Sequence, residues 1–177
     1  MEFPPKKILD LGCGLNKTPG AVCLDKVRDV NPDIVHDLES FPYPFDENVF
    51  DEIKLNSVIE HISDVLALME ECHRIAKPGA ELEIVTPHYS SSNSWTDPTH
   101  KQHLGYFSFD FFTGAEGMIG FYSSKRFEII HRKLFLHTRH KVFGIEWLAN
   151  RFPRTWEKFY CYRYPARHMI IKMRVIK

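Results

Sequence analysis

The first half of the chain alternates short apolar runs with polar residues and glycines. The runs cover residues 7–11, 21–24, 33–36, 49–55 and 81–86, and each is followed by a polar residue or a glycine. Short, nearly continuous apolar runs are typical of strands in a parallel sheet that is covered on both faces. The pattern therefore predicts five strands of one mostly parallel sheet.

One helix stands out between the fourth and fifth runs. Apolar side chains recur with helical spacing over residues 65–75, and residues 77–79, Lys-Pro-Gly, are typical of a helix end. Ser57 and Glu60 fit a capping box, and the Ser63-Asp64 pair offers a second start.

The pattern weakens after residue 87. Residues 107–119 and 145–152 are predicted as helices, and residues 127–136 and 168–176 as two long strands that form an antiparallel pair. The expected fold class is therefore α/β, with a mostly parallel sheet and a C-terminal antiparallel strand pair.

Composition excludes several classes of protein. Of the 177 residues, 44% are hydrophobic and 14% aromatic, which excludes a disordered chain and suits one domain over residues 1–177. No apolar run approaches the ~18 residues of a membrane span, and the first residues lack the apolar segment of a signal peptide. Four scattered cysteines without a CxxC motif indicate reduced thiols and a cytoplasmic protein.

Charge is distributed unevenly. Residues 125–177 carry a net charge of +11, and residues 1–124 carry −11. A basic third of this kind suits a phosphate, a carboxylate or a membrane surface as partner. The alternative is that the two parts pair with each other or face solvent.

The first strand runs directly into a glycine turn, Gly12-Cys13-Gly14. A strand followed by such a turn is typical of the nucleotide-binding corner of an open α/β sheet. Lys17 stands where a dinucleotide fingerprint has its last glycine, and the P-loop ending is absent too. Asp25 and Asp37 end the next two runs, where they can accept hydrogen bonds from ribose hydroxyls and from an adenine amine.

These segments resemble class I S-adenosylmethionine-dependent methyltransferases, specifically a short form of the type 11-like group. The resemblance covers residues 7–87 and is carried by residues 8–14, 33–38, 41–45, 50–53, 56–62 and 74–80. It implies a Rossmann-like sheet, a cofactor-binding half (1–87), a substrate-side half (88–177) and S-adenosyl-L-methionine as cofactor. It also implies an enzyme that transfers a methyl group.

The resemblance assigns a role in cofactor binding to eight residues. Asp10 is implied at the amino-acid end, the glycine turn beneath the sulfonium and ribose, and Asn56 at the methionine moiety through its backbone. Asp25 is implied at the ribose. The full set is Asp10, Gly12, Cys13, Gly14, Asp25, Asp37, Leu38 and Asn56.

Two features depart from the family pattern. Asn16 replaces a third glycine, and the intervals from Gly14 to Asp25 and from Asp25 to Asp37 are too short for a helix and a strand. The first crossover helices are therefore expected to be shortened or missing. One flank of the sheet would then be bare unless a second copy of the chain or the basic third covers it.

The loop after the fifth strand is the expected acceptor site, because ligands bind beyond the carboxyl ends of the strands. We expect His88 or His100 to act as general base and Asp97 to orient it. Tyr89 and Tyr106 are expected to form the pocket wall. Two alternatives stay open, a metal ion held by these residues with His103, and a solvated loop in which Asp97 caps a turn. We expect no metal, because transfer from a sulfonium needs no Lewis acid.

Three functions fit these observations. The first is methyl transfer to a small molecule, for which an anion is one candidate, and the second is a non-catalytic subunit that binds an anionic partner. The third is a methyltransferase directed to nucleic acid or to a membrane surface through its basic third. The aromatic residues that would stack or insert there are Trp147, Phe152, Trp156, Phe159 and Tyr160.

Overall fold

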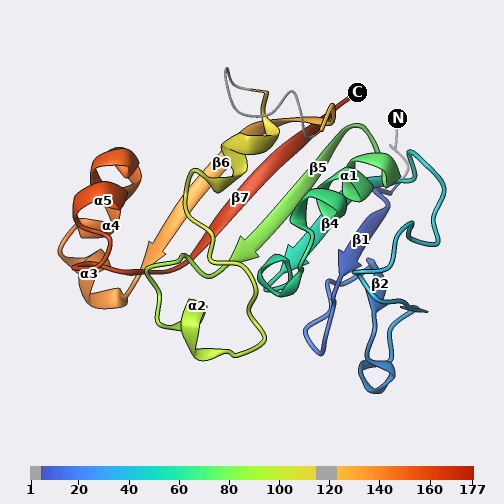
Figure 1. The fold of residues 1–177 in the computed structure, drawn as a ribbon, viewed down its shortest axis with the longest axis horizontal. Coiled ribbons are helices and arrows are strands. Elements are labelled where there is room, and N and C mark those ends of the chain that lie inside the picture. Colours follow the sequence, from blue (N-terminus) through green and yellow to red (C-terminus); the bar gives the residue numbers. More distant parts are fainter. Residues whose placement is uncertain (1–4, 115–122) are drawn as a thin grey trace.

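The computed structural model describes residues 5–114 and 123–177, which form a seven-stranded sheet in the order β3-β2-β1-β4-β5-β7-β6 (Figure 1). Strands β1 to β5 are parallel, and β7 is antiparallel to both β5 and β6. The strands are β1 (Ile8–Leu11), β2 (Val22–Asp25), β3 (Ile34–Val35), β4 (Phe50–Asn56), β5 (Ala76–Thr86), β6 (Arg126–Leu136) and β7 (Ala166–Ile176). The predicted mostly parallel sheet with a C-terminal antiparallel pair is confirmed.

The helices of the described residues are short. The α-helices are α1 (Val65–Ile75), α2 (Asn93–Thr96), α3 (Thr138–Val142), α4 (Ile145–Arg151) and α5 (Pro153–Phe159). The 3-10 helices are η1 (Arg28–Val30), η2 (Ile59–His61) and η3 (Ser108–Phe112). None of these helices is long and apolar enough to cross a membrane.

The main predicted helix, α1, begins at the second of its two candidate starts. The Asp64 carboxylate accepts a hydrogen bond from Ala67 N at 2.9 Å, so it caps the helix. Ser57 instead has a positive φ of 55°, and Glu60 lies in η2, so the predicted capping box does not form.

The crossovers around β2 are loops, as their length predicts. Residues 12–21 connect β1 to β2 without a helix, and β2 is followed only by the single turn η1. Even without these helices, β1, β2 and β3 pair as parallel neighbours in the sheet.

One face of the sheet is buried, and the other is buried at β1 and β2 but half exposed at β4 and β5. Strand β5 alternates, so that Leu82 and Ile84 are buried while Glu81 and Glu83 reach the opposite face. There Lys54 lies 3.8 Å and Lys172 lies 2.6 Å from Glu83. The expectation that both faces are covered therefore holds at β1 and β2 and is wrong at β5. The ion pairs keep the second face compatible with water, and a second copy covering it stays a prediction.

The C-terminal half differs in detail from the expected elements. A five-residue η3 lies at the start of the helix expected over 107–119, and residues 115–119 of that range lie outside the described residues. The helix expected over 145–152 is divided into α4 and α5, because Pro153 begins a new helix. All four cysteines have free, buried thiols.

Candidate functional site

The glycine turn after β1 is shaped by close packing. Gly12 has a φ of +63°, and a Cβ there would lie 2.6 Å from Cγ2 of Val58, which follows β4. Gly12 N also donates a hydrogen bond to Leu24 O at the end of β2. Only glycine fits this position without strain, so the backbone turns tightly where the ends of β1, β2 and β4 meet.

Two adjoining hollows lie at these strand ends and share Gly12 and Ser57. The first, about 380 Å³, is lined by Gly12, Asp25, Lys26, Asp37, Leu38, Glu39, Ser57, Val58, His61, Ile62, Thr99 and Lys101. The second, about 610 Å³, is lined by Asp10, Gly12, Cys13, Gly14, Leu15, Asn16, Thr18, Lys54, Leu55, Asn56, Ser57, Glu83 and Val85. The structure thus brings all eight predicted cofactor-binding residues to one continuous edge of the sheet.

The two buried acids of this edge hold the loop backbone. Asp25 Oδ2 accepts from Gly14 N and its Oδ1 accepts from Val27 N, both at 2.9 Å. Asp10 Oδ2 accepts from Thr18 N at 2.7 Å. Each carboxylate oxygen has two lone pairs, so Asp25 keeps acceptor capacity for the hydroxyl groups of a ligand.

The remaining predicted residues complete a wall with polar and apolar parts. Asp37 is exposed in the first hollow beside the buried Leu38, whose carbonyl accepts from Tyr43 Oη at 2.9 Å. Cys13 lies beneath the turn, and burial, with a hydrogen bond to Cys23, raises its thiol pKa to about 12. Cys13 is therefore a neutral packing residue and not a nucleophile.

An ion pair joins two loops at the rim of the first hollow. Lys101 Nζ lies 2.9 Å and 3.0 Å from the two carboxylate oxygens of Glu39, and it also donates to Ser63 Oγ at 2.8 Å. Lys101 and Ser63 lower the pKa of Glu39 to about 2. The loop that follows β5 is thereby tied to the loop that follows β3.

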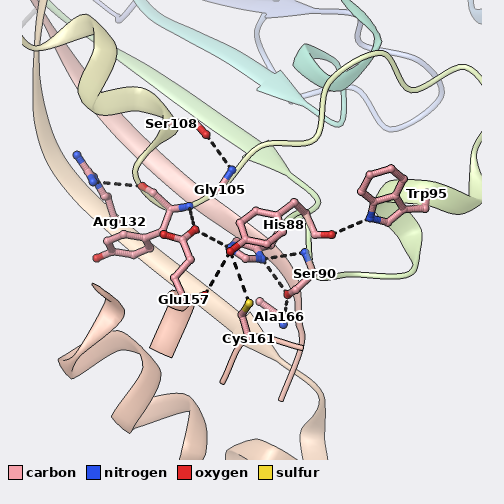
Figure 2. A network of polar contacts seen from close by, with 11 residues as sticks. His88, Ser90, Trp95, Gly105, Ser108, Arg132, Glu157, Cys161 and Ala166 are labelled. Carbon is pink, nitrogen blue, oxygen red and sulfur yellow. Dashed lines mark hydrogen bonds and ion pairs between the residues drawn. The ribbon is translucent and has the colours of Figure 1, made fainter. Parts of the chain in front are cut away.

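His88 lies in a buried network that joins the end of β5 to α5 (Figure 2). Its Nε2 lies 3.1 Å from Glu157 Oε1, and its Nδ1 accepts from Ser90 N at 3.1 Å. The same Glu157 oxygen accepts from Tyr106 N at 2.9 Å. Because His88 has no exposed surface and both ring nitrogens are engaged, the geometry does not support it as general base.

His100 and Asp97 belong to the loop that follows α2. Thr99 and Lys101 of the same loop line the first hollow. His100 Nε2 is 3.9 Å from Asp97 Oδ2, too far for a hydrogen bond, while its Nδ1 lies 3.0 Å from Ser94 O. Asp97 Oδ1 accepts from the hydroxyl and the backbone of Thr99, and these bonds lower the Asp97 pKa. The backbone of Ser94 therefore orients His100, and Asp97 caps the turn.

Two residues that lie beside His100, Glu60 and His61, were not predicted as site residues. The His61 and His100 rings are 4.6 Å apart, and a ligand atom from each of Glu60, His61 and His100 lies within 4.8 Å of the others. Burial raises the pKa of Glu60. The sequence feature that could have identified them is the position of Glu60-His61 just after β4, at the same sheet edge as the glycine turn.

The other predicted acceptor-site residues lie elsewhere. Tyr89 lines a separate hollow of about 580 Å³ with His103, which stacks on Trp95 at 3.6 Å. Tyr106 packs below Arg132, whose guanidinium lies 5.3 Å from its ring centroid. His88 and His103 are not part of the group formed by Glu60, His61 and His100.

Four of the five aromatic residues predicted to stack or insert are exposed on α4, α5 and their ends. Trp147, Phe152, Phe159 and Tyr160 are at least half exposed, whereas Trp156 is buried. The exposed cations Arg151 and Lys158 lie over the rings of Phe152 and Phe159.

Comparison with known proteins assigns the family. A family model described as a methyltransferase domain matches residues 2–130. No curated protein sequence matches the chain.

Solved structures share the fold at low sequence identity. A SAM dependent methyltransferase from Archaeoglobus fulgidus has a TM-score of 0.59 and 16% identity, over 96% of this chain and 86% of that one. An S-adenosylmethionine dependent methyltransferase from Mesorhizobium loti has a TM-score of 0.58 and 16% identity, over 96% and 90%. The YcgJ protein from Bacillus subtilis has a TM-score of 0.61 and 14% identity, over 97% and 92%. With its strand order and glycine turn, the chain belongs to the methyltransferase domain family and has the class I methyltransferase fold.

Proposed function

We propose that the protein transfers a methyl group from S-adenosyl-L-methionine to a small molecule, which the basic third of the chain would favour as an anion. The observation that carries this proposal is the convergence of all eight predicted cofactor-binding residues on the two adjoining hollows. When bound, the cofactor supplies an electrophilic methyl group.

The residues present fit a nucleoside with an amino-acid tail. Asp25 is held by two backbone amides with free lone pairs toward the first hollow, as the two hydroxyls of a ribose require. Leu38 and Val58 offer apolar surface to a base, and Asp37 offers an acceptor to its amine. Asn56 and Asp10 place polar groups in the second hollow, which suits a zwitterionic tail.

Proton removal from the acceptor is assigned to His100. Its Nδ1–H donates to Ser94 O, so Nε2 carries the lone pair. The His100 ring lies 4.6 Å from the ring of His61, which lines the first hollow. Asp97 lies 3.9 Å from Nε2 and would stabilise the charged ring. General-base assistance is typically worth ~10²–10⁴-fold in rate.

Calorimetry with S-adenosylmethionine and with its demethylated product tests the proposal. We expect one site per chain, and we expect Asp25→Ala to weaken binding at least tenfold, since two charge-assisted hydrogen bonds are lost. Asp29→Ala is the matched control, because Asp29 is an exposed acid on η1 outside both hollows. A folded protein that binds neither molecule would refute the proposal. Binding without methylation of any tested metabolite, followed by mass spectrometry, would instead favour a non-catalytic subunit.

A second candidate, methyl transfer at an anionic membrane surface, is favoured by the exposed aromatic side chains of α4 and α5. Arg151, Arg154 and Lys158 surround them, and none of the three has an ion-pair partner among the described residues. Flotation with vesicles containing anionic lipid would show binding that declines with added salt. Equal recovery with neutral vesicles, or binding to RNA only, would count against this candidate.

A further inference from the structure

Three side chains with metal-binding atoms meet beside the first hollow, which one of them, His61, lines. Glu60 and His61 lie on η2 after β4, whereas His100 comes from the loop after β5. Lys101 N and Gln102 N donate to Glu60 O at 2.7 Å and 3.0 Å, so the backbone of this loop is fixed against η2. The three ligand atoms lie within 4.8 Å of one another.

The Glu60 carboxylate is only half satisfied. The residue is 2% exposed, and Oε2 accepts from Thr86 Oγ1 at 3.0 Å. Its Oε1 is buried and has no hydrogen-bond partner. A buried carboxylate oxygen without a donor is costly unless it is protonated or faces a cation. Either a proton or a bound cation at Oε1 would remove this cost.

In both histidines, Nδ1 donates a hydrogen bond to an oxygen atom and Nε2 is unprotonated. His100 Nδ1 lies 3.0 Å from a carbonyl oxygen, which can only accept, so this nitrogen carries the proton. His61 Nδ1 lies 3.0 Å from Thr99 Oγ1, and that hydroxyl gives its own proton to Asp97 at 2.6 Å. His61 Nδ1 must therefore donate as well. Each ring keeps a free Nε2 lone pair, the arrangement found in metal-binding histidines whose other nitrogen donates to an oxygen.

We propose that Glu60, His61 and His100 together bind one divalent transition-metal ion. Two imidazoles and one carboxylate form the donor set of catalytic zinc sites and of open non-haem iron sites, and they leave positions for a further ligand. Ligand atoms on one ion at ~2.0–2.2 Å stand roughly 3–4 Å apart, so small side-chain movements would close the present spacing.

The inference rests on the proposed function and changes the part played by His100. An acceptor hydroxyl on the ion would have a lowered pKa and would lose its proton to water. The oxygen would then form the bond to the methyl carbon as the carbon–sulfur bond breaks and the sulfonium becomes a neutral thioether. In this case His100 Nε2 holds the ion, and general-base assistance by a free His100 is not needed.

Zinc binding to the chelator-treated protein, measured by equilibrium dialysis without S-adenosylmethionine, tests the inference. We expect one saturable zinc ion per chain and an X-ray absorption spectrum with nitrogen and oxygen ligands at ~2.0–2.1 Å, without sulfur at ~2.3 Å. Glu60→Gln and His61→Ala should each weaken zinc binding more than the ~10–100-fold typical of a lost outer partner. Circular dichroism checks that each variant is folded, and Glu60→Gln keeps the size of the side chain.

His103→Ala is the matched control. It removes an exposed histidine of the same loop that is not part of the group, so zinc affinity should not change. Absence of saturable binding, sulfur ligation, or equal affinity in wild type and both variants would overturn the inference. None of these results affects the proposed function, which depends on calorimetry with S-adenosylmethionine.

Discussion

Replacing Gly12 with alanine should destabilise the glycine turn in two ways, by backbone strain and by a steric clash. A non-glycine residue in the left-handed region costs about 1–2 kcal/mol, and Gly12 has a φ of +63°. The new Cβ would also lie 2.6 Å from Val58 Cγ2, and such overpacking costs about 1–3 kcal/mol. Gly12→Ala should therefore lower the free energy of unfolding by about 2–5 kcal/mol.

Gly20→Ala provides the matched control for this experiment. Gly20 has a φ of +76°, but a Cβ there meets nothing within 4 Å. Gly20→Ala therefore introduces backbone strain without a clash, and it should lower the free energy of unfolding by about 1–2 kcal/mol. The effect of alanine on the unfolded chain is similar in both variants and cancels in the comparison.

Urea unfolding, followed by tryptophan fluorescence, measures both variants. The double variant Gly12→Ala/Val58→Ala should be less destabilised than the sum of its single changes, because the clash is removed. If Gly12→Ala lowers the free energy of unfolding no more than Gly20→Ala does, close packing against Val58 does not constrain Gly12. We also expect Gly12→Ala to weaken S-adenosylmethionine binding, since the clash displaces the turn between the two hollows.

Three further changes test individual contacts. Asp64→Ala removes the cap of α1 and should cost about 0.5–2 kcal/mol in urea unfolding, with Asp64→Asn close to wild type. The Glu39–Lys101 pair lowers the Glu39 pKa from 4.5 to about 2, so its stabilisation is present above about pH 4.5 and lost as pH falls through about 2. Both side chains are more than a third exposed, so at neutral pH the free energy of unfolding of Glu39→Gln should be lower than that of wild type by less than about 1 kcal/mol. At about pH 2 the two proteins should be equally stable. His88→Ala should lower the free energy of unfolding by about 2–4 kcal/mol, measured as a lower thermal midpoint, because Glu157 loses a buried partner. Unchanged stability with lost turnover would instead support His88 as general base.

The predicted strands were confirmed where local pattern decides the structure. Each strand contains a run of apolar residues, and pairing with neighbours requires only that such runs follow one another at the right intervals. Coverage of the sheet was predicted correctly for β1 and β2, which are buried on consecutive positions, and wrongly for β5, where Glu81-Leu82-Glu83-Ile84 alternates. That alternation is typical of a strand with one solvated face, and it describes β5 correctly.

Local sequence determined the α/β class and the residues around the glycine turn. These residues directly follow strands, and parallel strands bring their carboxyl ends to one edge, so chain position was enough to place them together. Tertiary structure alone decided the positions of the histidines. His88 became a buried partner of Glu157, which lies far along the chain on α5, and His100 was brought to Glu60 by backbone hydrogen bonds from the loop after β5. The physical reason is that these contacts depend on how a loop without periodic pattern folds back onto the sheet edge, and no local spacing encodes that path.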